Sequence, residues 1–235
     1  MEGKINQLQI IEYEKEVTYY LTNVLPTIEK AIPPSISLEI ETAVDYIELR
    51  AKFYSNIITN ELLSLQEEHV SYFVELDQRL KKRERIIEKI VQKMNIDNMS
   101  IKDASNGIKD SLRYTIVVDD CVYVEKVDEY LRKIEDMGYK VVNLKNKWGD
   151  EFYQGINVFF ADELGFKFEI QFHTPNGYTI KEGKLRDVYT IIRDENSPED
   201  LVKKCNEIRK YYQAQVRIPK GAMDYQYSSY VKKRG

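Results

Sequence analysis

The chain has 235 residues, a formal net charge of −4 and 43% hydrophobic residues. This length suits one α/β core with a helical appendage, and the hydrophobic fraction is that of a globular protein. The acidic balance argues against a nucleic-acid coat. Two histidines, His69 and His173, leave almost no room for the histidine-rich metal site of a metal-dependent phosphohydrolase.

The two cysteines, Cys121 and Cys205, lie far apart without metal-ligand spacing. They indicate a reducing compartment, so we expect a cytoplasmic protein. The N-terminal residues carry neither the basic nor the apolar region of a secretory signal. No run approaches the ~18 apolar residues of a membrane span, and we expect no membrane association.

Helices are predicted for the first part of the chain. Apolar residues recur at helical spacing over residues 4–24, which Pro26 closes, and again from Ile36 to about Met94. Pro33-Pro34 mark a turn between these segments. Residues 1–75 are therefore interpreted as an N-terminal helical region. It carries no recognisable motif, and we expect it to pack on the core, or else to bind a partner such as an antitoxin or a second copy of the chain.

The pattern changes near Asn106-Gly107. β-Branched and aromatic runs, with amphipathic segments between and after them, predict strands at 111–118, 139–144, 153–160 and 166–173 and helices at 122–137, 179–193 and 199–216. This order predicts an α+β fold with a mixed, mostly antiparallel sheet of four to five strands flanked by helices. The predicted division is 1–75 helical region, 76–195 core, and 196–235 C-terminal helix with a basic tail.

The strand at 166–173 alternates without interruption. Lys167, Glu169, Gln171 and His173 share one face, and apolar side chains share the other. One interpretation is an amphipathic strand with a solvated face. The alternative is a chemical site, because a carboxylate backed by an apolar core can hold Mg²⁺ or take a proton from a hydroxyl.

Two further patterns are weak when taken alone. Asp110 and Arg113 flank the start of the strand at 111–118, where an acid and a cation can hold a metal ion and a phosphate side by side. Lys81, Arg85 and Lys89 are spaced to share one helix face, as a polyphosphate site or as a solvated charged face.

These patterns, in this order, resemble the RelA/SpoT-type synthetases, which are nucleotide pyrophosphokinases, over about residues 75–195. The basic motif Arg-x-Lys-x-x-x-Ser-x-x-x-Lys is matched by Arg79, Lys81 and Lys89, with Arg85 in place of the serine. The motif of an acid followed by arginine resembles Asp110 and Arg113, at a shorter spacing.

The last two motifs of the family also have counterparts. The acceptor loop is matched at Tyr153, with Asn157 in place of its histidine. The motif Glu-x-Gln-Ile-Arg-Thr is similar to Glu169-Ile-Gln-Phe-His-Thr174, with His173 in place of arginine. The chain resembles a divergent small or toxin-like member of this family.

The resemblance implies a nucleotidyltransferase-like sheet and transfer of pyrophosphate from ATP to a ribose 3′-hydroxyl, on a guanine or adenine nucleotide or on a tRNA 3′ end. Asp110 and Glu169 would be catalytic and would hold Mg²⁺. ATP and its phosphates would bind Arg79, Lys81, Arg85, Lys89 and Arg113, and the acceptor would bind Tyr153, Asn157, Gln171 and His173. The alternatives are a nucleotide-binding module without catalysis, and a structural or interaction protein.

Overall fold

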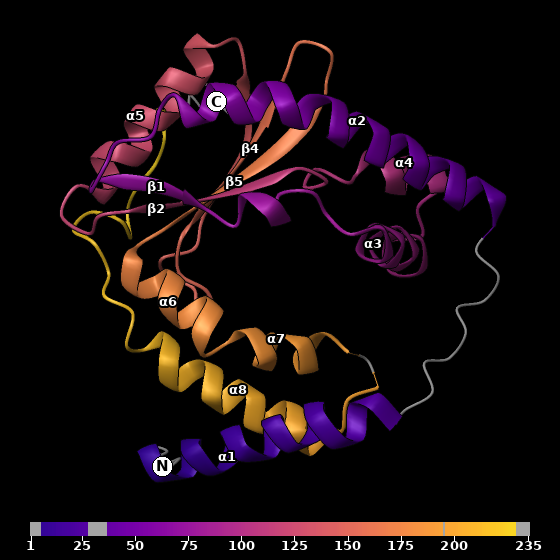
Figure 1. Ribbon diagram of the computed structural model, residues 1–235, viewed down its shortest axis with the longest axis vertical. Coiled ribbons are helices and arrows are strands. Elements are labelled where there is room, and N and C mark those ends of the chain that lie inside the picture. Colours follow the sequence, from indigo (N-terminus) through magenta and orange to yellow (C-terminus); the bar gives the residue numbers. More distant parts are fainter. Residues whose placement is uncertain (1–5, 28–36, 195, 229–235) are drawn as a thin grey trace. The chain divides into compact units, whose positions relative to one another are not determined.

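The structure is a computed structural model that describes residues 6–27, 37–194 and 196–228 (Figure 1). The turn expected at Pro33-Pro34 and the expected basic tail at 231–235 lie outside the described residues. Contacts group the chain into two compact units, one of Met1–Pro33, Trp148–Gln154 and Pro175–Ile218 and one of the remaining segments Pro34–Lys147, Gly155–Thr174 and Pro219–Gly235. The division at residues 75 and 195 stays a prediction, because compact grouping does not test which segments fold independently.

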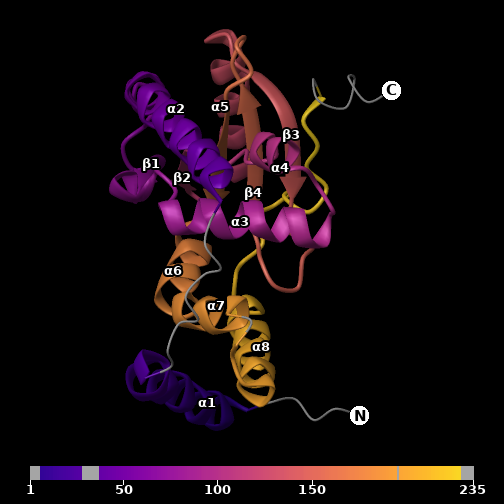
Figure 2. The same ribbon diagram turned by 90° about the vertical axis from the view of Figure 1, so that its right-hand side faces the viewer.

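The first unit is helical. In the described chain it contains α1 (Gln7–Tyr19), a π-helical turn (Tyr20–Val24), a 3-10 turn (Leu25–Thr27), α6 (Pro175–Gly183), α7 (Arg186–Arg193) and α8 (Glu199–Gln213). Asn6 caps α1, since its side chain accepts a hydrogen bond from the Gln9 N–H. α1 and α7 both pack on α8, and Figure 2 shows α1 beside the end of α8. Ile10, Ile191 and Ile208 are buried in this unit.

The single helix predicted over 179–193 is in fact two, α6 and α7. The N–H groups of Lys184 and Leu185 both donate to the Ile180 carbonyl, which ends α6. The side chain of Leu185 is fully buried. Burial of Leu185 therefore accompanies a change of direction that an amphipathic pattern alone does not reveal.

The second unit is built on a five-stranded sheet in the order β1-β2-β5-β4-β3. Its elements in the described chain are α2 (Leu38–Leu63), β1 (Ser71–Val74), a 3-10 turn (Leu76–Gln78), α3 (Arg83–Ile96), α4 (Ile101–Asn106), β2 (Arg113–Val118), α5 (Tyr123–Asp136), β3 (Lys140–Asn146), β4 (Ile156–Ala161) and β5 (Lys167–His173). The pairs β1–β2, β3–β4 and β4–β5 are antiparallel, and β2–β5 is parallel. The predicted α+β class and mixed, mostly antiparallel sheet are confirmed.

One face of the sheet carries the apolar core. Tyr114, Phe168 and Phe172 alternate onto this face from β2 and β5, and each is at most 1% exposed. The Tyr114 hydroxyl lies 2.8 Å from the Thr59 hydroxyl of α2. The Tyr123 hydroxyl of α5 donates to the Phe172 carbonyl at 2.8 Å. Helices α2 and α5 therefore lie against this face (Figure 1).

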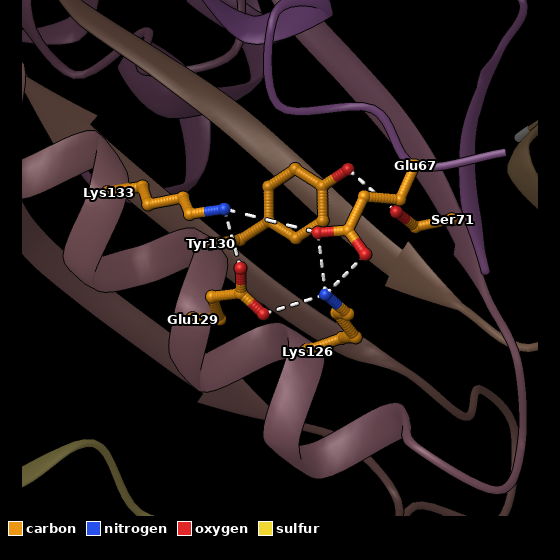
Figure 3. Close-up of polar contacts among 6 residues, drawn as sticks. All are labelled: Glu67, Ser71, Lys126, Glu129, Tyr130 and Lys133. Carbon is orange, nitrogen blue, oxygen red and sulfur yellow. Dashed lines mark hydrogen bonds and ion pairs between the residues drawn. The ribbon is translucent and has the colours of Figure 1, made fainter.

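α5 is also joined to the segment that precedes β1. The Lys126 ammonium contacts the carboxylates of Glu67 and Glu129, and Lys133 contacts the same two acids (Figure 3). The Ser71 and Tyr130 hydroxyls are 2.9 Å apart beneath them. Two acids and two lysines balance one another in this cluster, which we call the α5 charge cluster.

The prediction of long helical segments from Ile36 to about Met94 is wrong in the middle part of this range. Helices α2 and α3 are present, but β1 lies between them and pairs with β2. Lys81 precedes α3 instead of lying on it, because the segment around Leu80 pairs with Leu112 as an isolated bridge. Within the described ranges, no helix is both long and apolar enough to cross a bilayer.

Candidate active site

Two buried carboxylates lie at the starts of neighbouring strands in the sheet unit. Asp110 stands just before β2 and is 8% exposed, and Glu169 lies in β5 and is 4% exposed. The Glu169 N–H donates to the Leu112 carbonyl at 3.0 Å, and Glu169 is in register with Arg113. Parallel pairing of β2 and β5 therefore places both acids at the same edge of the sheet.

Asp110 is held by two lysines. The Lys81 ammonium lies 2.6 Å from one carboxylate oxygen, and the Lys89 ammonium lies 2.8 Å from the other. Backbone pairing fixes Lys81, because its N–H donates to the Ser111 carbonyl at 2.9 Å. Lys89 comes from α3. One carboxylate with two lysines leaves a local excess of positive charge.

The electrostatics of this trio follow from burial and attraction. Burial by itself raises the pKa of Asp110, but the nearby Lys81 and Lys89 outweigh it and lower that pKa to about 2. Burial lowers the pKa of Lys81, and Asp110 partly offsets this effect. Asp110 is therefore ionised at neutral pH and remains able to accept further contacts through its oxygens.

Glu169 has a different environment. Its pKa is raised by burial and by the charge of Asp110, while Arg113, a hydrogen bond with Gln171 and Lys81 act in the opposite direction. The Asn157 side-chain amide donates to one of its oxygens at 3.0 Å. A carboxylate with a raised pKa is a better proton acceptor than an exposed one. The solvated-face interpretation of β5 is thus wrong, since Glu169, Gln171 and His173 are all at most 7% exposed.

Asp110 and Glu169 present the oxygen donors that Mg²⁺ prefers. Mg²⁺ is usually held by one or two carboxylates together with substrate phosphates, so two acids are sufficient. Burial and then the charge of Asp110 raise the pKa of Glu169, and a divalent cation held by both acids would offset their repulsion. Among the described residues, no group of three or more His, Cys, Asp or Glu side chains is arranged to hold a metal by protein ligands alone.

The side chains of two predicted phosphate-binding residues, Arg79 and Arg85, contact groups other than Asp110 and Glu169. The Arg79 side chain donates to the Ser55 hydroxyl of α2 at 2.7 Å and to the Leu76 carbonyl at 2.5 Å. Arg85 forms an ion pair with Glu88 at 2.7 Å on the exposed side of α3. The prediction that Lys81, Arg85 and Lys89 share one helix face is wrong, because Lys81 lies outside the helix.

The predicted acceptor residues lie in different units. Asn157, Gln171 and His173 belong to β4 and β5 of the sheet unit, and Asn157 is in register with Gln171. Tyr153 belongs to the loop Trp148–Gln154 of the helical unit. In that unit the Tyr189 hydroxyl donates to the Phe152 carbonyl at 2.9 Å. Helix α7 therefore fixes the carbonyl group of Phe152, the residue before Tyr153.

Sequence reasoning missed Gly155 and a group of lysines. A Cβ on Gly155 would lie 2.8 Å from the Phe172 carbonyl and 3.1 Å from the His173 ring, and its φ of +151° also favours glycine. Burial lowers the pKa of Lys109, and so do Lys167, Lys145 and Lys93, in that order. Lys109 precedes Asp110 directly, and that adjacency was the available signal.

The fold and site together define an α+β protein with a paired-carboxylate, lysine-rich edge. No family model matches the chain, and no curated protein matches it. Solved structures do match it. The chain is similar to the type VI effector Tas1, solved with its immunity protein, at 21% identity over 74% of this chain and 97% of that one, with a TM-score of 0.47.

Two further structures belong to named synthetases. Small alarmone synthetase 2 from Bacillus subtilis is 14% identical over 80% of this chain and 96% of its own, with a TM-score of 0.47. A GTP pyrophosphokinase family protein from Streptococcus pneumoniae is 14% identical over 77% and 90%, with a TM-score of 0.43. Identities this low do not carry a substrate or a mechanism across to this chain.

Proposed function

We propose that this chain transfers a pyrophosphoryl group from ATP to a ribose 3′-hydroxyl of a nucleotide or of a tRNA 3′ end. The observation that carries the proposal is the lysine-bound Asp110 beside the buried Glu169 at one sheet edge. A polyphosphate needs several cations, and Lys81, Lys89 and Arg113 gather there with few acids to neutralise them.

The proposed reaction begins with the acceptor hydroxyl. Its oxygen attacks the β-phosphorus of ATP, the bond from that phosphorus to the α-phosphate oxygen breaks, and AMP leaves. Glu169 takes the hydroxyl proton, a role supported by the raised pKa of its carboxyl group. Asn157 holds one oxygen of Glu169 and orients the carboxylate. The lysines balance charge on the phosphates during transfer.

Mg²⁺ fits the same two acids. Asp110 and Glu169 would hold it, and a bound Mg²⁺ supplies charge neutralisation of the triphosphate. Lys81 and Lys89 keep Asp110 ionised whether or not a metal is bound, because they lower its pKa to about 2. Asp110 would thus be ionised and able to hold the metal at neutral pH.

The assay uses the full chain with Mg²⁺ and γ-labelled ATP, and offers GDP, GTP, ADP, AMP and tRNA in separate reactions. Chromatography separates a labelled acceptor from labelled pyrophosphate and phosphate. We expect label on at least one acceptor, with AMP formed in equal amount. Label found only as free phosphate, or none transferred to any acceptor, contradicts the proposal.

A second candidate function is nucleotide binding without catalysis. It is favoured by one observation, since the Arg79 and Arg85 side chains are engaged by Ser55 and Glu88 and not by the carboxylate site. Titration with a non-hydrolysable ATP analogue in Mg²⁺ separates the two functions. Binding of the analogue together with no transfer to any acceptor identifies the binding module.

A further inference from the structure

A pocket of about 340 Å³ lies in the sheet unit between α2, α4 and the hairpin that leads into β5. Its wall includes Tyr46, Arg50, Lys102, Ser105, Phe166 and Lys167. Neither of the two carboxylates lines it, and neither do Lys81, Lys89 and Arg113. The pocket falls at the lower end of the size range of small-molecule sites, about 300–1,000 Å³.

The charge of the pocket is positive. Three cations line it, from α2 (Arg50), α4 (Lys102) and β5 (Lys167), and no aspartate or glutamate does. Within the described residues none of the three forms an ion pair. This differs from Lys126 and Lys133 of the α5 charge cluster, which both have carboxylate partners. Cations gathered without acids favour an anionic ligand.

Arg50 is held in place before any ligand binds. The Tyr54 and Phe166 rings stack with centroids 4.2 Å apart and planes within 4°. The Arg50 guanidinium lies over both rings, at 5.8 Å and 5.4 Å, and over Tyr46 at 5.6 Å. A guanidinium that contacts several aromatic rings loses less side-chain entropy on binding an anion than a free one.

The remaining wall suits a ring with polar edges. The Ser105 hydroxyl is buried and forms no hydrogen bond with any described residue, and Asn106 adds an amide that can both donate and accept. Tyr46 is 60% exposed, so its side chain is open to contact, and Ile47 and Ile108 add apolar surface. An inorganic anion has no use for the ring of Tyr46 or the apolar surface of Ile47 and Ile108, whereas a heterocycle attached to a phosphate can contact all of these groups.

We propose that this pocket binds a nucleoside phosphate, with its phosphate on Arg50, Lys102 and Lys167 and its base beside Tyr46. The site is separate from the carboxylate site. The two nevertheless share strand starts, because Ser111 of the pocket follows Asp110 and Lys167 precedes Glu169 by two positions on the same strand.

The test photolabels the full chain with 8-azidoadenosine 5′-monophosphate and maps the labelled peptides. We expect label on the α2 peptide that contains Tyr46. Label should fall at least about tenfold in a Lys102→Gln/Lys167→Gln double variant, since two charge-assisted contacts are lost. A matched Lys52→Gln/Lys140→Gln variant, which removes two exposed lysines outside the pocket, should label like the unmodified chain, and equal melting temperatures show that both variants are folded.

Competition for the label and a second double variant complete the test. AMP should displace the label, and adenosine or inorganic phosphate should do so at least about tenfold less well. Label on Tyr46 should also persist in a Lys81→Gln/Lys89→Gln variant. No label on α2, equal label in the Lys102/Lys167 variant, equal competition by adenosine or phosphate, or loss of label with Lys81 and Lys89 would each overturn the proposal.

Discussion

The sheet unit contains two clusters of lysines and carboxylates, and they differ in burial and balance. In the α5 charge cluster, Glu67, Glu129 and Lys133 have side chains 38–44% exposed, and acids match lysines in number. At the carboxylate site, Asp110 is 10% exposed as a side chain and faces two lysines. A solvent-exposed cluster with equal numbers of acids and lysines needs no ligand to balance its charge. A buried cluster with excess positive charge is balanced when an anion binds.

The largest effect that this contrast predicts is on chemistry. Glu169→Gln should reduce pyrophosphoryl transfer by about 10²–10⁴-fold, because a general base is lost while the Asn157 contact can persist. Glu129→Gln in the α5 charge cluster should leave transfer unchanged. Initial rates with γ-labelled ATP measure both. Transfer by the Glu169 variant at the unmodified rate would remove Glu169 from the mechanism.

The same substitution has an opposite effect on stability. Burial raises the pKa of Glu169, so its ionised form costs folding free energy at pH 7, and that cost fades as pH falls and the carboxyl group protonates. Glu169→Gln should therefore raise Tm at pH 7 by roughly 2–4 °C, with a smaller gain near pH 4. Thermal melts at the two pH values measure this, and a lower Tm at pH 7 would contradict it.

The next effect concerns Asp110. Asp110→Asn leaves Lys81 and Lys89 close together without their acid, and should reduce the free energy of unfolding by about 2–3 kcal/mol. Glu129→Gln, the matched change in the exposed cluster, should cost about 1 kcal/mol or less. Urea unfolding at pH 7 compares them. Equal losses at both sites would erase the distinction between the clusters.

Acid titration gives a further comparison. The pKa of Asp110 is lowered to about 2, so its stabilising contribution is fully present above its unfolded value of about 3.9 and is lost as pH falls toward 2. The difference in unfolding free energy between the unmodified chain and Asp110→Asn should shrink over that interval. A difference that stays constant from pH 5 to pH 2 would mean that Lys81 and Lys89 do not lower the pKa of Asp110.

The smallest effect is expected from salt. Glu67→Gln removes contacts to Lys126 that are partly solvated, and should cost about 0.5–1 kcal/mol at low ionic strength. Raising NaCl from 0.05 to 1 M should remove most of that difference, since exposed pairs are screened. Urea midpoints at the two salt concentrations measure it. A salt-independent loss would indicate that the α5 charge cluster is shielded from solvent.

Periodicity located most of the sheet. The strands predicted at 111–118, 139–144, 153–160 and 166–173 correspond to β2, β3, β4 and β5, because their β-branched and aromatic residues alternate over enough positions to be distinctive. The sequence pattern does not predict β1, because Ser71–Val74 is only four residues long and its apolar residues also continue a helical pattern. Its pairing with β2 is a tertiary effect, which a local pattern does not contain.

The candidate site was predictable in composition but not in geometry. The spacing of Lys81 and Lys89 predicts that they share a helix face, yet they meet at Asp110 from a bridge and a helix. Arg85 fitted the same spacing and points instead to Glu88. The roles of Glu169, Tyr153 and His173 stay predictions until activity is measured.

The parallel pairing of β2 with β5 also sets when the site can exist. Asp110 and its lysines lie early in the chain, but α5, β3 and β4 must be made before β5 can take its place beside β2. A chain growing on the ribosome therefore contains Asp110 and its lysines before Glu169 is added. Translation thus supplies the second carboxylate of the proposed site after the first, and the two acids meet only once β5 has paired with β2.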